Sequence, residues 1–458
     1  MPDAIQGALS AIRRSHLLRL LLVGVLVLLL QIPVAMISGL VTERQARHHE
    51  AVEEVTSKWG KVQIITGPAL IVPYKHRWTE IGDKGQKIVQ TEVRYATFLP
   101  DRLQTKGKIE SEVRYRGIFS VPVYRFRAEM EGEFSRPSFS DWDIDTADIL
   151  WERTQLSVGI SDTRAIQEQT NLTWNGDQIT FLPGIGDFGS IASAGIHVPL
   201  THLLQAKRFT FSFPLILNGS VGMYFIPFGR DTVVKLKSNW SSPSFQGNWL
   251  PSHRTVLSNG FEATWTIPFL GRNYPQAWTS VIDVGKAIET SRFGVDLIVP
   301  VDNYRMSTRS VKYAGLFILL TFASIWLIEV LAQLRVHPVQ YLLLGAAMCI
   351  FYLLELSLSE HVGFGFAYLI ASIAIVGMVT TYSRVVLRTF RQAIIIGTVV
   401  AALYGYLYVL LKNEDYALLV GSVGLFVILG LIMFLTRRVN WYSTKLPEES
   451  ISLPTESK

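Results

Sequence analysis

Six long apolar stretches dominate the chain, and their spacing is uneven. One lies near the N-terminus, and the other five follow one another closely in the C-terminal third. Each is long enough for a helix to cross a hydrocarbon core of about 30 Å at about 1.5 Å per residue. The sequence therefore predicts six membrane spans. They are Leu20–Leu40, Ala314–Gln333, Tyr341–Leu358, Phe364–Tyr382, Ala393–Leu411 and Tyr416–Leu435.

Residues 42–310, between the first and second stretches, show a different pattern, in which apolar and polar residues alternate. In Tyr124–Met130 every second residue is apolar, and the residues between them are Arg or Glu. Arg208–Phe213 follows the same pattern with three phenylalanines. A period of two predicts antiparallel strands with one buried face. Similar runs are Gln63–Val72, Val93–Leu99, Val233–Lys237, Glu262–Ile267 and Phe293–Val299.

The expected fold is a membrane α-helical protein with six transmembrane helices and an extracytoplasmic, mainly-β, sandwich-like domain. Residues 43–59 are charged and lack Pro and Gly, so they predict a helix that continues from the first span. The β region is either one domain or two halves that meet around residues 150–190. The predicted divisions are a cytoplasmic N-terminus (1–16), a transmembrane helix (17–41), a periplasmic β-rich domain (42–310), a five-helix transmembrane bundle (311–436) and a cytoplasmic C-terminal tail (437–458).

The basic residues of the short connections favour one orientation, because Lys and Arg concentrate on the cytoplasmic side of a membrane. Both termini are therefore predicted to be cytoplasmic, in a multi-pass protein. Two groups disagree with this rule: Arg44 and Arg47 follow the first span, and Arg305, Arg309 and Lys312 precede the second. The residues that support the orientation are Arg13, Arg14, Arg19, Arg335, Arg384, Arg388, Arg391, Arg437, Arg438 and Lys445.

The first apolar stretch is predicted to be an uncleaved anchor. It is longer than the apolar region of a secretory signal, and no convincing small-residue cleavage site follows it. Pro33 lies within it, which a helix packed against neighbouring helices tolerates.

Composition narrows the possible partners and cofactors. The net charge of +6 is modest for 458 residues, and no dense Lys/Arg tract occurs, so nucleic acid is not expected as a partner. The single cysteine, Cys349, excludes an intramolecular disulfide and a cysteine-based zinc site. We expect no cofactor and no metal. The predicted partner is the lipid bilayer, together with an envelope protein, lipid or glycan that the β domain contacts.

Two short motifs are candidate chemical sites. Residues 184–189 match the G-x-G-x-x-G string of dinucleotide-binding loops, but Pro183 and a Gly/Ser/Ala-rich run flank them. They are predicted to form a glycine-rich connection. His48-His49-Glu50 is predicted to be a solvated helix face, since no further metal ligand stands at a typical spacing.

Polar residues within or beside the apolar stretches are the best functional candidates, because a charged group at mid-helix costs about 2.5–3.5 kcal/mol on insertion scales. Glu329 and Gln333 lie one turn apart toward the inner end of the second span. Glu355 lies toward the outer end of the third, so it is not expected to share a proton with Glu329. These residues either hydrogen-bond neighbouring helices or line a substrate or ion path. The candidates are Glu329, Gln333, Glu355, Ser359, Glu360 and His361.

Several strings resemble the CreD (Cet) family of bacterial inner-membrane proteins, and they cover nearly the whole chain. The most specific are Arg335–Gly345 and Leu358–Gly363 in the bundle. The others are Gly195–Leu200, Ser238–Pro251 with Asn259-Gly260-Phe261, Pro300–Tyr313, Phe351-Tyr352-Leu353-Leu354 and Met433–Ser443.

This resemblance implies a protein of the bacterial inner (plasma) membrane that is associated with envelope integrity, colicin tolerance and β-lactam response. The family's expression belongs to a carbon-source-responsive two-component system. It supplies no established catalytic residues. Ser359-Glu360-His361 matches the family pattern, as does the turn before Pro338, whereas Glu355 is replaceable within the family.

The favoured hypothesis is a non-enzymatic protein that contributes to cell-envelope integrity and stress tolerance through its periplasmic domain. A small-molecule or ion transporter, or a channel-like protein, that uses the C-terminal bundle is the alternative. An envelope enzyme with a site in the β domain is a weaker one.

Overall fold

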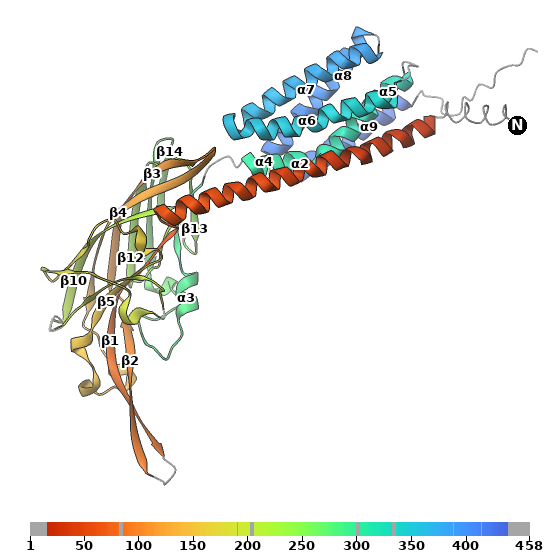
Figure 1. Ribbon diagram of the computed structural model, residues 1–458. Helices are drawn as coiled ribbons and strands as arrows, with labels where there is room; N and C mark the ends of the chain where they lie inside the picture. The colour runs from red at the N-terminus through yellow and green to blue at the C-terminus, as the bar shows by residue number, and fades with distance from the viewer. Residues whose placement is uncertain are drawn as a thin grey trace, which may run out of the picture. The chain divides into compact units, whose positions relative to one another are not determined.

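The computed structural model describes residues 16–81, 86–189, 191–201, 206–298, 303–331, 336–387, 389–413 and 415–437. The chain divides into two compact units (Figure 1). The helical unit comprises Met1–Ala46 and Val301–Lys458, and the β-unit comprises Arg47–Pro300. The predictions for residues 1–15, for Gln333 and for residues 438–458 lie outside the described residues.

Two mainly antiparallel sheets form the β-unit, and we call them sheets A and B. Sheet A contains β1 (Gln63–Ile81), β2 (Lys87–Phe98), β5 (Gln155–Ile160), β8 (Leu182–Pro183), β9 (Gly195–Pro199), β11 (Gly222–Phe225), β13 (Pro243–Gly247), β16 (Ala277–Thr279) and β17 (Phe293–Leu297). Sheet B contains β3 (Arg102–Arg116), β4 (Phe119–Ser135), β6 (Asn171–Trp174), β7 (Asp177–Thr180), β10 (Arg208–Ser220), β12 (Asp231–Ser238), β14 (His253–Leu257) and β15 (Gly260–Pro268).

Strand order follows the hydrogen bonds of each sheet. In sheet A the order is β13-β17-β11-β1-β5-β9-β8, with β2 paired to β1 and β16 paired to β2. In sheet B it is β14-β15-β12-β3-β4-β10-β6-β7. Two neighbouring pairs are parallel, β1 with β11 and β3 with β12. A short helix, α3 (Gly285–Thr290), precedes β17.

The alternating residues place one apolar face of each sheet in a shared core. On β10, Phe209, Phe211 and Phe213 are all buried, as the period of two predicts. Burying a side chain of this size contributes about 1.5–3 kcal/mol. The buried apolar residues of both sheets form one cluster that extends from Ile65 to Leu297. The mainly-β character predicted from the sequence is therefore confirmed, and the β-unit is a two-sheet sandwich.

The loop with the G-x-G-x-x-G string leads into a 3-10 turn, η5 (Gly186–Phe188), rather than into an α-helix. Gly184 and Gly186 both have positive φ, a conformation that glycine adopts at little cost. The prediction of a glycine-rich connection is confirmed.

The chain enters and leaves the β-unit at one end of sheet A. Helix α2 (His16–Trp59) precedes β1, and β17 is the last strand. Gln63 of β1 pairs with Met223 of β11, and Met223 pairs with Val295 of β17. The start of β1 and the end region of β17 are thus separated by a single strand.

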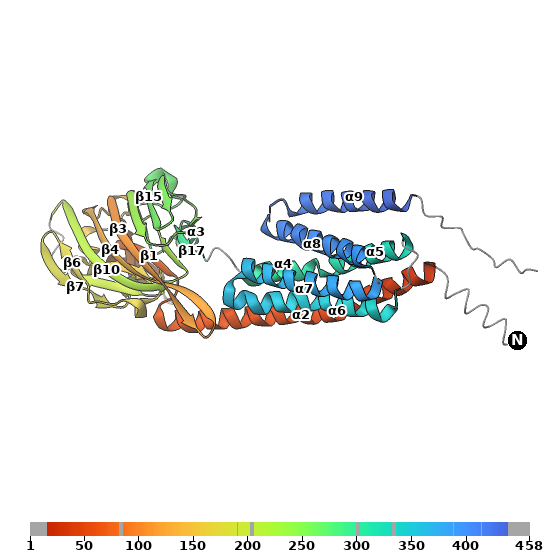
Figure 2. The same cartoon turned by 90° about the horizontal axis from the view of Figure 1, so that it is seen from above.

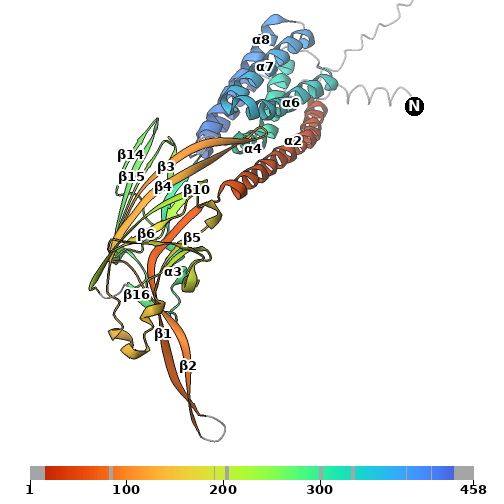
Figure 3. The ribbon, with the colours of Figure 1, turned by 60° about the vertical axis from the view of Figure 1, so that its left-hand side comes forward.

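The other end of β1 forms a hairpin with β2 that extends beyond the sandwich (Figures 1 and 3). We call Lys75–Ile81 and Lys87–Arg94 the arm. Below the arm, residues 65–71 of β1 pair with β5, and residues 96–98 of β2 pair with β16. Along the arm, the two strands have only each other as ladder partners among the described strands.

The helical unit contains the C-terminal helices and most of α2 (Figure 2). By length and composition, five described helices could cross a membrane, and the bent pair α4 and α5 makes six if it counts as one span. This pair bends by 45°, and α5 covers most of the second span that the sequence predicts, Ala314–Gln333. The helices are α4 (Asn303–Lys312), α5 (Ala314–Leu331), α6 (Pro338–Val362), α7 (Phe364–Leu387), α8 (Phe390–Lys412) and α9 (Ala417–Thr436).

A buried carboxylate fastens the start of β1 to the loop after β5. Asp162 accepts hydrogen bonds from the Lys61 backbone N–H and from Nε and a terminal nitrogen of Arg164. Burial by itself raises the pKa of Asp162, but the hydrogen bonds from Arg164 and Lys61 outweigh it and hold the pKa below its ordinary value.

We predict that the β-unit loses stability in acid because protonation of Asp162 removes the contribution of this contact. The native pKa of Asp162 lies below the unfolded one, so the unfolded chain takes up the proton first as the pH falls below about 4. Asp162 therefore contributes stability above that pH, and the contribution is lost below it. In Asp162→Asn, the denaturant midpoint from tryptophan fluorescence of the full-length protein should fall at neutral pH and depend less on acid. An unchanged acid dependence would contradict the assignment.

Candidate functional site

Helix α4 carries a polar face into the helical unit. Tyr304, Ser307, Ser310 and Val311 are buried and recur at helical spacing along one side. Three of these four residues are polar, which is unusual for a buried helix face. In a membrane such groups need partners inside the protein, because the hydrocarbon offers none.

Asn303, at the start of α4, joins the end of α6 to the start of α7. Its side-chain nitrogen donates to the carbonyl of Ser359 at 2.9 Å, and its side-chain oxygen accepts from the Phe364 N–H at 3.2 Å. One amide thus links two helix ends: it supplies an acceptor to the Phe364 N–H and a second donor to the Ser359 carbonyl, which also accepts from the Gly363 N–H. Gly363, between the two helices, has a φ of +79°, which explains a glycine there.

Glu360 receives donors from two other helices. Arg44 of α2 donates to both carboxylate oxygens, from Nε at 2.8 Å and from a terminal nitrogen at 2.5 Å. Tyr304 of α4 donates its hydroxyl to the same carboxylate at 2.9 Å. The Glu360 side chain is 7% exposed and that of Arg44 is 31% exposed. We call these three residues the clasp, since they join α2, α4 and α6.

Arg309 extends the network to α8. Its two terminal guanidinium nitrogens donate to the carbonyls of Leu411 at 3.1 Å and Leu410 at 3.2 Å. These carbonyls lie in the last turn of α8, where backbone acceptors lack helical donors and a cation is favourable. Arg44 and Arg309 disagreed with the charge rule, and the structure gives both a role in joining helices.

The structure brings together only part of the predicted candidate set. Ser359 and Glu360 lie in this network through Asn303, Arg44 and Tyr304. Glu355 is adjacent, and its Oε1 accepts from Ser307 of α4 at 2.6 Å. His361 follows in the same turn and is exposed.

Glu329 lies apart from the clasp. It is 4% exposed and accepts from the Tyr341 hydroxyl at 3.0 Å and from the Val336 N–H at 3.3 Å. These bonds tie the end of α5 to the start of α6. Gln333, its predicted neighbour, is outside the described residues.

Sequence reasoning missed Arg44 and Tyr304, which bond Glu360, and Asn303, which bonds the Ser359 carbonyl. Two signals pointed toward them. Arg44 was a cation on the wrong side of the predicted membrane, and Pro300–Tyr313 was one of the strings that carried the family resemblance. Neither signal identifies Glu360 as the partner, because 316 residues separate it from Arg44.

The turn before α6 forms as the proline there suggests. His337 caps the helix, with Val339 N–H bonded to its Nδ1 and Gln340 bonded back to its N–H. Pro338 occupies the first helical turn, where its missing N–H costs nothing.

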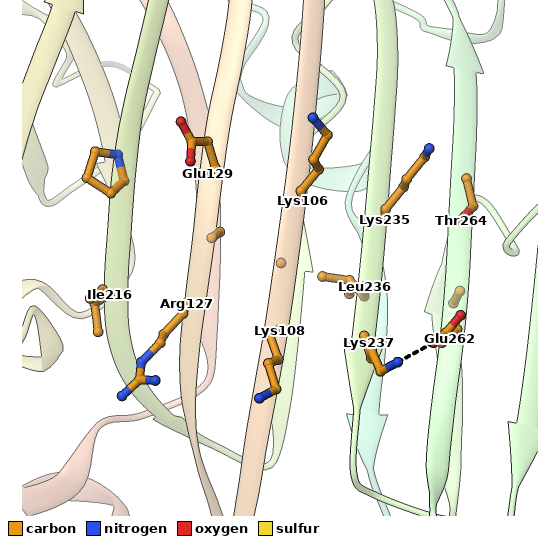
Figure 4. A pocket seen from close by; sticks show the side chains of 14 residues that line it. Lys106, Lys108, Arg127, Glu129, Ile216, Lys235, Leu236, Lys237, Glu262 and Thr264 are labelled. Atoms are coloured by element: carbon orange, nitrogen blue, oxygen red, sulfur yellow. Dashed lines mark hydrogen bonds and ion pairs between the residues drawn. The ribbon is translucent and has the colours of Figure 1, made fainter.

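The β-unit holds a second candidate, an open groove of about 540 Å³ on sheet B (Figure 4). Strands β3, β4, β10, β12 and β15 line it, and cations project from three of them. The lining cations are Lys106, Lys108, Arg127, Lys235 and Lys237.

Carboxylates neutralise most of the groove's cations. Lys237 pairs with Glu262 at 2.6 Å, and Lys106 pairs with Glu131 at 2.8 Å. Glu110 accepts from Lys108, and this hydrogen bond, aided by Arg127, lowers the pKa of the Glu110 carboxyl. Exposed pairs of this kind are worth about 0–1 kcal/mol each. The groove is therefore a solvated, mixed-charge sheet face that attracts anions weakly.

Among the residues that the structure describes, no group of three or more His, Cys, Asp or Glu side chains is arranged to hold a metal ion.

Comparison with known proteins assigns the chain to a family. The family model described as "Inner membrane protein CreD" matches residues 15–442. Inner membrane protein CreD of Escherichia coli (strain K12) is 31% identical over 428 residues, which cover 93% of this chain and 94% of that protein. The family match includes the clasp and the whole β-unit. The family resemblance of the sequence is confirmed.

We predict that Arg44 and Glu360 are energetically coupled. Removing one partner leaves the other buried or half-buried without its counter-charge, so each single change should destabilise the protein. Arg44→Gln combined with Glu360→Gln should cost less than the sum of the single changes, by about 0.5–3 kcal/mol. Denaturant unfolding in detergent can be followed by the thiol reactivity of buried Cys349. Tyr304→Phe, which removes one donor to Glu360 but keeps the ion pair, is the matched control. If the double change costs as much as the two single changes added together, the coupling is contradicted.

Proposed function

The chain belongs to the CreD family of inner membrane proteins, and on that basis we propose that it supports cell-envelope integrity and stress tolerance without catalysis. In this proposal the β-unit lies on the periplasmic side, both termini are cytoplasmic, and the arm binds a partner protein of the envelope. The single observation that carries the proposal is the composition of the arm.

Apolar side chains are exposed on both faces of the arm. Register places Val89 and Ile81 on one face and Trp78 and Ile88 on the other. The exposed fractions are 64% for Val89, 75% for Ile81, 41% for Trp78 and 46% for Ile88. A two-stranded ribbon is marginally stable alone in water, and contiguous exposed apolar groups mark interaction surfaces. A partner protein that covers these apolar side chains accounts for their presence on the surface and stabilises the two-stranded ribbon.

The backbone of the arm offers a second means of recognition. Ser280 bonds Tyr95 of β2 through its N–H and its hydroxyl, and β16 pairs with residues 96–98. Farther along, from Arg94 to Lys87, no described strand lies on that edge of β2. An unpaired edge can accept an added strand from a partner, with alternate side chains setting the specificity.

The arm is far from the points where the chain enters and leaves the β-unit. Nineteen residues of extended β1 cover about 60 Å from Gln63 to Ile81. In the proposed orientation, a partner can therefore be reached across the envelope space. Within the helical unit, the clasp joins Arg44, just before the β-unit in sequence, to Tyr304, just after it, through Glu360.

The proposed orientation predicts which engineered thiols an impermeant reagent will reach. The native Cys349 is 4% exposed, so Asn171→Cys on β6 provides a single accessible thiol. In spheroplasts it should react fully with a membrane-impermeant maleimide. Thr389→Cys, between α7 and α8, should react only after the membrane is opened. The reverse pattern would exclude a periplasmic β-unit.

Binding through the arm predicts a site-specific crosslink. A photoreactive amino acid in place of Val89 should yield a discrete adduct with one envelope protein in cells. The same residue in place of Val256, an exposed valine on β14, should not.

Ile81→Thr combined with Val89→Thr keeps strand propensity while removing apolar surface. This variant should reduce adduct formation from a crosslinker at Thr91 at least about tenfold, as expected for a loss of about 1.4 kcal/mol or more. It should also sensitise cells to detergent. Equal adducts from Val89 and Val256 would contradict the proposal.

A further inference from the structure

Two buried glutamates in the helical unit differ in how their oxygens are satisfied. Glu329 has a donor for each oxygen, from Tyr341 and from Val336. Glu355 is completely buried, and only its Oε1 has a donor, the Ser307 hydroxyl. Its Oε2 has no hydrogen-bond partner among the described residues.

A second unpartnered oxygen lies on α4. The Ser310 hydroxyl, one turn after Ser307, is completely buried and also lacks a partner within the described part of the chain. It faces the same carboxyl group. A protonated carboxyl can donate a hydrogen bond that an ionised one cannot, and a serine oxygen can accept it. One proton on Oε2 therefore gives partners to both atoms.

No described cation compensates a charge on Glu355. Arg309 of α4 donates to the carbonyls of α8, and Arg44 of α2 donates to Glu360. The ionisable side chains that interact electrostatically with Glu355 are phenols, Tyr352 of α6 and Tyr368 of α7. Phenols are neutral at neutral pH. An ionised Glu355 would be a buried charge without a counter-charge, which is strongly unfavourable.

The number of free oxygens distinguishes a proton from a metal cation. Ca²⁺ takes 6–8 oxygen ligands, and Mg²⁺ requires a near-octahedral set. The facing surfaces of α4 and α6 offer the two unpartnered oxygens described here, with Ser307 already committed to Oε1. This arrangement suits one proton better than a metal ion.

We propose that Glu355 is a proton-binding site and that the bound proton fastens α4 to α6. With the proton present, Ser307 and Ser310 both bond the neutral carboxyl group, and α4 packs against α6. Loss of the proton to water leaves a buried carboxylate that faces only two neutral serine hydroxyls and has no described cation to balance its charge, so α4 must separate from α6 to let water reach it. Helix α4 is the first described helix after the β-unit. The presence or absence of the proton on Glu355 therefore controls how this helix packs. This is a property of this chain, and it does not depend on what the arm binds.

Infrared spectroscopy of the full-length protein in nanodiscs tests whether the proton is present. At neutral pH the spectrum should contain the carbonyl band of a protonated carboxylic acid. The band should be absent in Glu355→Gln and retained in Glu329→Gln, the matched control. In Ser310→Ala it should persist at higher frequency, since the acceptor is gone. A band that survives in Glu355→Gln, or no such band in the wild type, would overturn the proposal.

Distance measurements by electron paramagnetic resonance test whether the proton fastens α4. Spin labels at Lys312→Cys and Leu353→Cys, in a Cys349→Ala background, report on α4 relative to α6. The wild-type distance distribution should be narrow at neutral pH and should broaden toward longer distances at alkaline pH. Glu355→Gln, which cannot ionise, should stay narrow at both, and Glu329→Gln should behave like the wild type. Broadening that is equal in Glu355→Gln, or no broadening in the wild type, would contradict control by Glu355.

If a rise in sodium concentration at fixed neutral pH abolishes the infrared band, the site binds a metal cation in exchange for the proton. That result would overturn the assignment of the proton as the specific occupant.

Discussion

The need to satisfy polar groups away from water governs the helical unit. Helix α4 brings an amide, a phenol and two buried serine hydroxyls into a region of apolar helices, where an unpartnered polar group costs several kcal/mol. The side chains of α4 therefore bond to polar groups of other helices. Asn303 serves the ends of α6 and α7, Tyr304 serves Glu360, and Arg309 serves the end of α8. One short helix thus connects three others, α6, α7 and α8.

The sequence predicts elements well where a single period decides them. The membrane spans come from length and hydropathy, and the strands of the sandwich come from alternation, as the three buried phenylalanines of β10 show. The second apolar run begins at Ala314, where α5 begins, so the hydropathy pattern does not include α4. The residues of α4 are too polar to be read as part of a span, yet one of its faces is buried.

The clasp was beyond pattern reasoning for a different reason. A hydropathy argument assigns each residue a depth, but it does not say which residues at one depth meet. Depth separates Glu355 from Glu329 in the predicted topology, and in the structure the two carboxylates have different partners, Ser307 for Glu355 and Tyr341 for Glu329. That Arg44 bonds Glu360, while Glu355 has a serine, depends on how α2 and α4 pack around α6. Arg44 and Arg309, which disagree with the charge rule in the predicted orientation, both have specific partners in the helical unit.

The arm shows where alternation ceases to describe a single buried face. In the sandwich each strand has one apolar side, and a core residue there has a neighbour in the opposite sheet. In the arm, Trp78 and Val89 lie on opposite sides of a ribbon, and both are exposed among the described residues. The run Val93–Leu99 crosses this boundary, since Val93 is 37% exposed whereas Ala96 is fully buried. A chain that only needed a stable sandwich would gain nothing from apolar groups on both sides of a projecting ribbon. No described strand pairs with that edge of β2, so its backbone donors and acceptors add to the surface. The proposed protein partner would satisfy both the apolar groups and the edge if it added a strand.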